Sequence, residues 1–129
     1  MTSYDEIIIY LAGIVDGEGC ITTKFDKRSP NYLGIRFSIE MTNRTPLDLF
    51  SSIFGGNICK YQRSIDRKLS YKYDISGNKA LAVLKQITPY LRVKKQQAEL
   101  ALKIFHLKSL NESFENQNQI SCQIRELNK

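Results

Sequence analysis

The chain has 129 residues, a length that suits one domain with its own hydrophobic core. Nineteen basic and thirteen acidic side chains give a net charge of +6 and a pI near 9.3, which favours a polyanionic partner. Three cysteines without a C-x-x-C pair and a single histidine argue against a disulfide framework, a zinc site and Ser-His-Asp catalysis.

The first apolar run of the sequence suits neither a membrane nor a secretory signal. Residues Ile7 to Val15 are far fewer than the roughly 20 that a membrane-spanning helix needs. Asp5 and Glu6 precede this run, where a signal peptide carries positive charge. We therefore expect no membrane partner and a reducing intracellular compartment.

The first predicted element is a helix that begins at Ser3. Ser3 and Glu6 have the capping-box spacing, and a broad apolar surface follows over residues 7–15. Glycine inside a helix costs about 1 kcal/mol relative to alanine, so Gly13 indicates a close contact with another helix. Gly17 and Gly19 are expected to end the helix and to leave a carboxylate near its carboxyl end.

Two strands are predicted next, over residues 20–28 and 32–42. Apolar and polar side chains alternate in both segments, which is typical of half-buried strands. Ser29-Pro30-Asn31 between them has turn chemistry. We expect an antiparallel hairpin with one apolar and one polar face.

The second half of the sequence predicts further helices and one more hairpin. A helix is expected with Thr45 at its N-cap and Pro46 at N1, and Gly55-Gly56 should end it. A hairpin of residues 58–63 and 69–76 follows. Gly77-Asn78 then opens a short helix, Pro89 interrupts the helical pattern, and a longer helix covers residues 93–110. The polar segment 112–119 leaves three alternatives open, because it suits a cap on the core, an extension of the interface or a mobile tail. Ile120, Ile124 and Leu127 suit a final short amphipathic helix.

The segment from Leu11 to Gly19 reads LAGIVDGEG and resembles the nine-residue LAGLIDADG motif of homing endonucleases. In that family two motif helices pack side by side, and the penultimate acid, here Glu18, binds a divalent metal. An apolar helix that ends in a glycine-rich turn is a common structural feature, which stays open as an alternative. A nucleotide site is disfavoured, because the glycines lack the G-x-G-x-x-G spacing and no Walker loop is present.

The resemblance extends over residues 4–110, because the order α-β-β-α-β-β-α matches the fold of this family. It implies an α+β fold in which helices back a four-stranded antiparallel sheet whose polar face lies along DNA. We expect one domain over residues 1–129, with 111–129 as a polar C-terminal extension. One motif per chain implies a homodimer through paired motif helices. The expected interface residues are Leu11, Ala12, Gly13, Val15 and Asp16.

Two further segments resemble active-site parts of the intron-encoded homodimeric branch. Residues 90–98 match the segment that carries an active-site lysine, here Lys94, although a solvated basic helix start is an open alternative. Asn43 falls at the position of an amide that helps to order active-site waters. Relatives often place a basic residue where this chain has Leu47, so that role is either vacant or taken by Arg44.

The resemblance implies hydrolysis of phosphodiester bonds with a divalent metal. A hard cation held by carboxylates activates water and stabilises charge at phosphorus. One Glu18 is a poor site, whereas two from paired helices are a good one, with Gly17 as a further ligand. We expect Mg²⁺ as the cofactor, Mn²⁺ as a substitute, and Ca²⁺ to support DNA binding without cleavage.

The candidate DNA contacts lie on the polar faces of the predicted strands and just beyond them. Lysine and arginine suit guanine and phosphate, glutamine suits adenine, and acids accept from cytosine. The candidates are Thr22, Lys24, Asp26, Arg28, Arg36, Ser38, Glu40, Arg44, Lys60, Gln62, Lys72 and Asp74. Exposed strand faces are polar in most proteins, so the pattern indicates a face more than any single contact.

The implied function is a site-specific double-strand DNA endonuclease that cuts a long pseudo-palindromic target as a homodimer and leaves 3′ overhangs. The alternative is a non-catalytic binder on the same fold, either an intron maturase that binds intron RNA or a DNA-binding regulator. Glu18 and Lys94 favour the enzyme, because a binder gains nothing from negative charge concentrated at a DNA-facing site. A chain rich in lysine, isoleucine and asparagine suits an AT-rich organellar genome. We expect an intracellular location, either in an organelle (mitochondrion or chloroplast) or in a prokaryotic cytoplasm.

Overall fold

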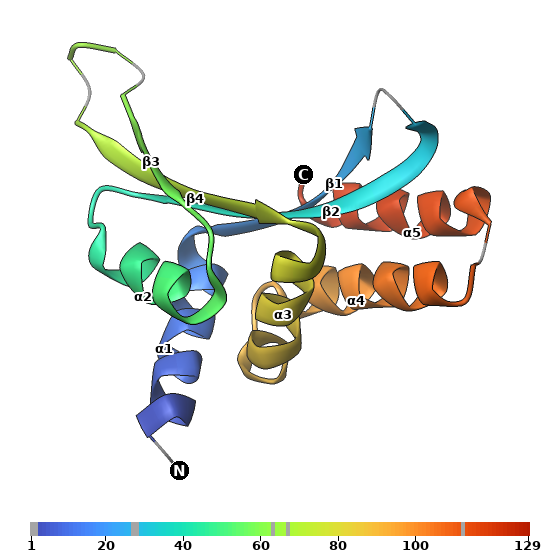
Figure 1. Ribbon diagram of the computed structural model, residues 1–129, viewed down its shortest axis with the longest axis horizontal. Coiled ribbons are helices and arrows are strands. Elements are labelled where there is room, and N and C mark those ends of the chain that lie inside the picture. The colour runs from blue at the N-terminus through green and yellow to red at the C-terminus, as the bar shows by residue number, and fades with distance from the viewer. Residues whose placement is uncertain (1–2, 27–28, 63, 67, 112) are drawn as a thin grey trace.

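A single four-stranded antiparallel sheet, with strand order β1-β2-β4-β3, organises the protein. The computed structural model describes residues 3–26, 29–62, 64–66, 68–111 and 113–129. Its elements are α1 (Ser3–Glu18), β1 (Gly19–Asp26), β2 (Ser29–Met41), α2 (Thr45–Phe54), β3 (Ile58–Tyr61), β4 (Ser70–Ser76), α3 (Gly77–Ile87), a 3-10 turn η1 (Thr88–Tyr90), α4 (Lys95–Ser109) and α5 (Phe114–Leu127). The expected order of helices and strands is confirmed. In Figure 1 the helices lie on one side of the sheet, which leaves its other face open.

The pairing of the strands fixes which side chains face the helices. β2 pairs with β1 from Gly19↔Ile39 to Phe25↔Leu33, and with β4 from Arg36↔Ser76 to Met41↔Tyr71. Residues directly opposite each other share a face, and the side chains alternate along each strand. The expected turn at residues 29–31 is wrong, because β2 already begins at Ser29 and the register shifts after Phe25.

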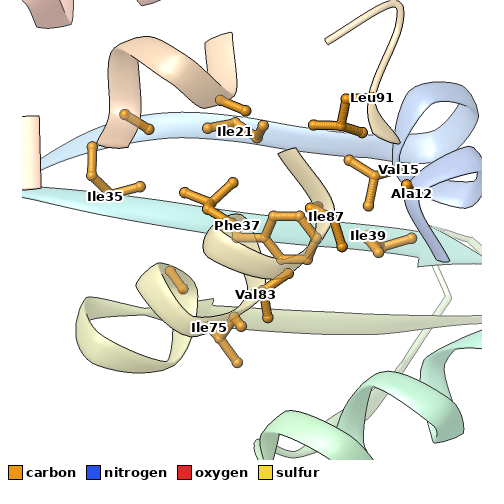
Figure 2. Packing of buried hydrophobic residues seen from close by; sticks show 14 of the residues in the cluster. Ala12, Val15, Ile21, Ile35, Phe37, Ile39, Ile75, Val83, Ile87 and Leu91 are labelled. Carbon is orange, nitrogen blue, oxygen red and sulfur yellow. The ribbon is translucent and has the colours of Figure 1, made fainter. Parts of the chain in front are cut away.

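The core lies between the sheet and the helices, as Figure 2 shows for residues of α1, α3 and the central strands. α1 contributes its apolar stripe at helical spacing, Ile8, Leu11, Ala12 and Val15. In Figure 2 the ring of Phe37 of β2 lies next to Val83 and Ile87 of α3, and all three belong to the buried cluster. Full burial of each such large side chain contributes about 1.5–3 kcal/mol, so the core holds the carboxyl end of α1 firmly against the sheet.

The C-terminal segment contains the predicted final helix, which begins earlier than Ile120 and includes most of the polar stretch whose role the sequence left open. α5 begins at Phe114, and its N-cap residue is Ser113, whose hydroxyl accepts a 3.2 Å hydrogen bond from the backbone N–H of Asn116. The ring of Phe114 meets that of Phe25 edge-on with centroids 6.0 Å apart. The sequence pattern hid the first part of this helix because polar Gln117 and Ser121 share its buried face.

Hydrogen bonds attach α5 to the edge strand β1. The hydroxyls of Thr23 and Ser121 lie 2.6 Å apart, and the Nδ2 of Asn128 donates to the carbonyl oxygen of Ile21 at 2.8 Å. α5 thereby covers an otherwise open strand edge, and Asn128 provides a hydrogen-bond partner for one of the backbone carbonyls of that edge. Among the described residues, no helix combines the length and the apolarity that crossing a lipid bilayer requires.

Candidate active site and nucleic-acid interface

The junction between α1 and β1 places Glu18 at the last position of the helix. We expected Gly17 to end the helix, and this is wrong, because α1 continues through Glu18 and β1 follows at once. A Cβ atom at Gly19 would lie 2.9 Å from Val15 Cγ1 and 3.0 Å from the Val15 carbonyl oxygen. Only glycine therefore permits this direct passage from helix to strand.

Glu18 and Asn43, 25 positions apart in sequence, line the same open cavity of about 320 Å³. The other lining residues are Glu40, Met41, Thr42 and Ser70, from the adjoining ends of β2 and β4. The carboxylate of Glu18 is exposed and has no hydrogen-bond or ion-pair partner within the described ranges. An unpaired carboxylate at a helix carboxyl end is electrostatically unfavourable by itself, which fits a cation or its hydrated shell as partner.

Asn43 has a local structural role beside the cavity. Its Oδ1 accepts a 3.0 Å hydrogen bond from the backbone N–H of Thr45, the first residue of α2. This turn makes Arg44 the N-cap residue, one position before the expected N-cap at Thr45. The amide nitrogen of Asn43 has no described protein partner, so it is the part of the side chain that can meet a ligand in the cavity.

Asp16 and Lys94 connect the carboxyl end of α1 to the amino end of α4. The Asp16 carboxylate accepts backbone hydrogen bonds from Arg92 (2.9 Å), Val93 (3.1 Å) and Lys94 (3.0 Å). The Nζ of Lys94 donates in return to the carbonyl oxygen of Val15 at 3.1 Å. An acid thus serves a helix amino end and a cation serves a helix carboxyl end, the favourable arrangement for both macrodipoles. We call this pair of interactions the reciprocal cap.

The reciprocal cap places Lys94 one turn of helix before Glu18, across 76 positions of sequence. α4 begins at Lys95 and not at residue 93, with Lys94 as its N-cap residue. The ammonium group therefore points away from its own helix and toward the end of α1, so it is not a solvated helix start. The structure brings the predicted acid and the predicted cation to the same helix end.

Three of the expected dimer-interface residues have no surface to offer a partner. Leu11, Ala12 and Val15 are each 0% exposed within the single chain, so that prediction is wrong for them. Their side chains form the core stripe of α1. Asp16 is likewise occupied by the reciprocal cap.

The opposite side of α1 is exposed and carries two glycines. Gly13 and Gly17 lie one turn apart on it, beside Tyr10, which is 49% exposed. A Cβ atom added at either glycine would meet nothing within 4 Å. The packing of the single chain therefore does not require glycine at these positions, and a second helix could approach closely there.

The open face of the sheet carries most of the predicted DNA contacts. Thr22 pairs with Arg36, Ser38 with Asp74, and Glu40 with Lys72, so these side chains share the face that the helices leave uncovered. Lys24 pairs with Gly34 on the same face. The alternation predicted this placement, and contact with DNA remains a prediction. Arg28 and the side chain of Asp26 lie outside the described residues.

Lys60 lies on the other face, contrary to expectation. It pairs with Tyr71, and two positions earlier Ile58 pairs with the buried Tyr73, so Lys60 shares the parity of the helix-facing side chains. The parity of apolar Ile58 was the signal that we missed. Cys59 and Tyr61 take its place on the open face. Gln62 lies beyond the end of β3, exposed to solvent.

Arg44 does not join the open face either. Its guanidinium carbon lies 5.6 Å above the centroid of the Tyr71 ring, and its Nε donates to Asp48 at 3.0 Å. Tyr71 belongs to the helix-facing side, so Arg44 lies at the end of the sheet near the start of α2. Leu47, the apolar residue at the position where the resemblance led us to look for a basic group, is fully buried in the core.

The strongest electrostatic interaction on the open face joins Arg36 of β2 to Asp74 of β4. The Arg36 Nε donates to Oδ1 and Oδ2 of Asp74 at 2.9 and 3.0 Å, and its Nη2 donates to Oδ2. This hydrogen bonding holds the pKa of the Asp74 carboxyl below its usual value and raises the pKa of Arg36. Both groups therefore stay charged at neutral pH.

A single chain supplies only part of a metal site. Within the described ranges, no three His, Cys, Asp or Glu side chains gather closely enough to hold a metal ion. Cys20, Cys59 and Cys122 are exposed free thiols in separate places. Oxygen donors at Glu18 suit a hard divalent cation, and a second copy of α1 would be needed to complete the set.

Comparisons with known proteins agree with this architecture. A family model described as LAGLIDADG endonuclease matches residues 11–106. The homing endonuclease I-CvuI, solved in complex with its target in the presence of Ca, has a TM-score of 0.74 and 20% identity over 98% of this chain and 85% of its own. The archaeal intron-encoded homing endonuclease I-Vdi141I, complexed with DNA, has a TM-score of 0.70 and 20% identity over 97% and 86% of the two chains.

The homing endonuclease I-TnaI is also similar, with a TM-score of 0.63 and 16% identity over 94% of this chain and 92% of its own. At these identities the solved structures show a shared fold, and the expected fold class is confirmed. The search of curated proteins finds no match.

Proposed function

The chain belongs to the LAGLIDADG endonuclease family, and from this premise we propose that it is a site-specific, divalent-metal-dependent double-strand DNA endonuclease that acts as a homodimer. The observation that carries the proposal is the environment of Glu18. An unpaired carboxylate ends the motif helix, lines a cavity with Asn43, and lies one turn beyond the carbonyl that holds the Lys94 ammonium.

The donor set of this site fits a hard divalent cation. Glu18 would supply a carboxylate oxygen and Gly17 a backbone carbonyl from the last turn of α1, where carbonyls lack helical partners. Bound there, such an ion lowers the pKa of a water molecule and stabilises charge on the phosphate. We propose Mg²⁺ for this role, Mn²⁺ as a substitute, and Ca²⁺ as an ion that supports binding without cleavage; similar proteins have been solved with Ca or Mg and DNA.

The chain's own residues have distinct roles in the proposed hydrolysis. Lys94, held at the end of α1, stabilises the negative charge that develops on the scissile phosphate. The Nδ2 of Asn43 orients water in the cavity beside Glu18. Arg44 remains the candidate for the second basic group, at the end of the sheet and outside its open face.

Two copies of the exposed glycine face of α1 form the proposed dimer interface. Pairing through Gly13 and Gly17 would bring both Glu18 carboxylates close to a two-fold axis. Each subunit would then read one half of a long pseudo-palindromic duplex with the open face of its sheet. Cleavage of both strands at the centre would leave 3′ overhangs, as the family resemblance implies.

The proposal is tested with the purified protein and a library of partly randomised duplexes that resemble intron insertion sites. We expect a unique double-strand cut with Mg²⁺ and binding without a cut in Ca²⁺. Glu18→Gln should lower the cleavage rate by about 100-fold or more while binding in Ca²⁺ persists, because several kcal/mol of transition-state stabilisation are lost. Glu99→Gln, an exposed carboxylate on α4, is the matched control.

Retained cutting by Glu18→Gln would reject the proposed site. Tight binding of a folded intron RNA, without cleavage of any duplex in either metal, would instead favour the maturase.

Three exposed thiols, Cys20, Cys59 and Cys122, suit a reducing compartment, and we propose an organelle or a prokaryotic cytoplasm as the site of action.

A further inference from the structure

The Arg36–Asp74 pair occupies the middle of the surface that the proposed function assigns to DNA. β2 and β4 are the two central strands, and both side chains belong to the open face. Their side chains are 39% and 35% exposed, so the pair is supported by the sheet and still accessible from outside. A ligand that approaches this face meets the two groups as one unit.

The stereochemistry of the pair leaves one edge of the guanidinium available. Asp74 takes the Nε–Nη2 edge, through the two Nε hydrogen bonds and the Nη2 bond. A planar guanidinium has five N–H donors in a fixed fork, so the Nη1–Nη2 edge still presents two parallel donors. Within the described residues, Nη1 has no protein acceptor.

The free edge matches one base edge in particular. Guanine presents two adjacent acceptors, O6 and N7, in the major groove, and bidentate arginine is their commonest specific partner. Adenine replaces O6 with a donor, and the thymine edge has a single acceptor, so neither accepts both N–H groups. An arginine already fixed at its other edge loses less side-chain entropy when it binds.

The charges around Asp74 explain why an acid is tolerated on this surface. A lone carboxylate would repel DNA phosphates. Here the Arg36 hydrogen bond is the largest cause of the lowered pKa of Asp74, and the positive charges of Lys72 and Lys24 contribute as well. The carboxylate is thus surrounded by three cations and its two oxygens already accept from Arg36. This environment suits an acid that holds an arginine better than one that reads a base.

We propose, resting on the proposed function, that Arg36 reads a guanine in each half-site through its Nη1–Nη2 edge, and that Asp74 is a positioning residue for Arg36 and not a reader of cytosine. Arg36 is thereby a specificity-determining residue of the DNA interface. A phosphate could also use this edge, and the experiment separates the two ligands because only a base contact depends on sequence.

The test measures binding in Ca²⁺ to the target selected from the duplex library and to every single-base-pair variant of it. For the unchanged protein we expect one symmetric pair of target positions at which guanine is preferred. In the Arg36→Ala variant we expect this preference to be lost. The loss should be about 10-fold to 100-fold per half-site, the value of a good bidentate pair. Asp74→Asn should weaken the same guanine preference while raising affinity for unrelated duplexes, because a negative charge is removed.

Each outcome has a defined meaning. Glu126→Gln, which breaks the exposed Glu126–Lys129 pair on α5, is the matched control and should change neither quantity. If Arg36→Ala lowers the binding affinity for all duplex sequences equally, Arg36 contacts a phosphate, and the inference is overturned. If Asp74→Asn removes the sequence preference at a different base pair from the one that Arg36→Ala affects, Asp74 reads a base itself. Failure of the unchanged protein to bind any duplex would overturn the proposed function, whereas binding and cutting without a guanine position would overturn this inference alone.

Discussion

Replacing Asp16 with asparagine should loosen the start of α4 from the end of α1. The carboxylate accepts three backbone hydrogen bonds in the reciprocal cap, one through Oδ2 from Arg92 and two through Oδ1 from Val93 and Lys94. Asparagine keeps a single oxygen, which can retain the two bonds at Oδ1. It turns an N–H group toward the Arg92 amide and loses the negative charge that favours the amino end of α4.

The magnitude follows from the exposure of the three donors. A hydrogen bond to a charged group contributes about 1.5–3 kcal/mol, but a water molecule can replace the partner of an exposed amide. The bonds from Arg92 and Val93 are exposed, and the bond from Lys94 is only partly buried. One lost bond and two weakened ones therefore predict a fall of about 1–2 kcal/mol in the free energy of unfolding.

Urea unfolding and single-turnover cleavage measure the two consequences. Since the backbone of Lys94 is held by Asp16, we expect Asp16→Asn to slow cleavage about 10-fold while DNA binding in Ca²⁺ stays unchanged. Glu126→Gln is the control, because the exposed Glu126–Lys129 pair on α5 should contribute less than about 0.5 kcal/mol. If Asp16→Asn behaves like Glu126→Gln in both assays, the reciprocal cap does not position Lys94.

Two further substitutions test the interface and the core. Gly13→Leu should leave the single chain folded, because nothing lies within 4 Å of an added Cβ, and should convert the dimer to a monomer in sedimentation velocity; a dimer of unchanged affinity would contradict the proposed interface. Burial raises the pKa of Tyr73 to about 12, above the ordinary value of 10.0, so its contribution to stability is present below pH 10 and is lost as the pH rises toward 12. Tyr73→Phe should lower the free energy of unfolding by about 1 kcal/mol at neutral pH, because it removes the 2.6 Å hydrogen bond to the Gly55 carbonyl oxygen. Between pH 10 and 12, however, the free energy of unfolding should fall less steeply in this variant than in the unchanged protein. An equally steep alkaline loss of stability in Tyr73→Phe would show that other groups cause it.

Local patterns predicted the parts of the structure that local physics determines. Strand alternation placed Arg36 and Asp74 on the same open face, and the motif placed Glu18 at the end of a helix. The resemblance also indicated Lys94, which the structure brings to the end of that helix. The predictions for Arg36, Asp74 and Glu18 depend on the spacing of side chains along one element, which a sequence displays directly, whereas the prediction for Lys94 depended on the resemblance.

The missed features depend on contacts between distant segments. Nothing near Asp16 in the sequence indicates that its partners are the backbone amides of residues 92–94. The two sides of α1 are both apolar or small, so the sequence could not say that Leu11 faces the core and Gly13 the solvent. The first part of α5 was obscured because the buried face of this helix includes Gln117 and Ser121; the Ser121 hydroxyl lies 2.6 Å from that of Thr23 of β1.

The reciprocal cap also bears on when the protein becomes active during its synthesis. The contacts from Asp16 span 76 to 78 positions, so they close late, after the intervening chain has collapsed onto the core. A nascent chain of which only α1 and β1 have left the ribosome contains Glu18, but it does not yet present Lys94, whose ammonium group lies at the same end of α1 in the folded protein. The proposed arrangement of Glu18 and Lys94 at the end of α1 is therefore completed only after most of the domain has been synthesised and folded.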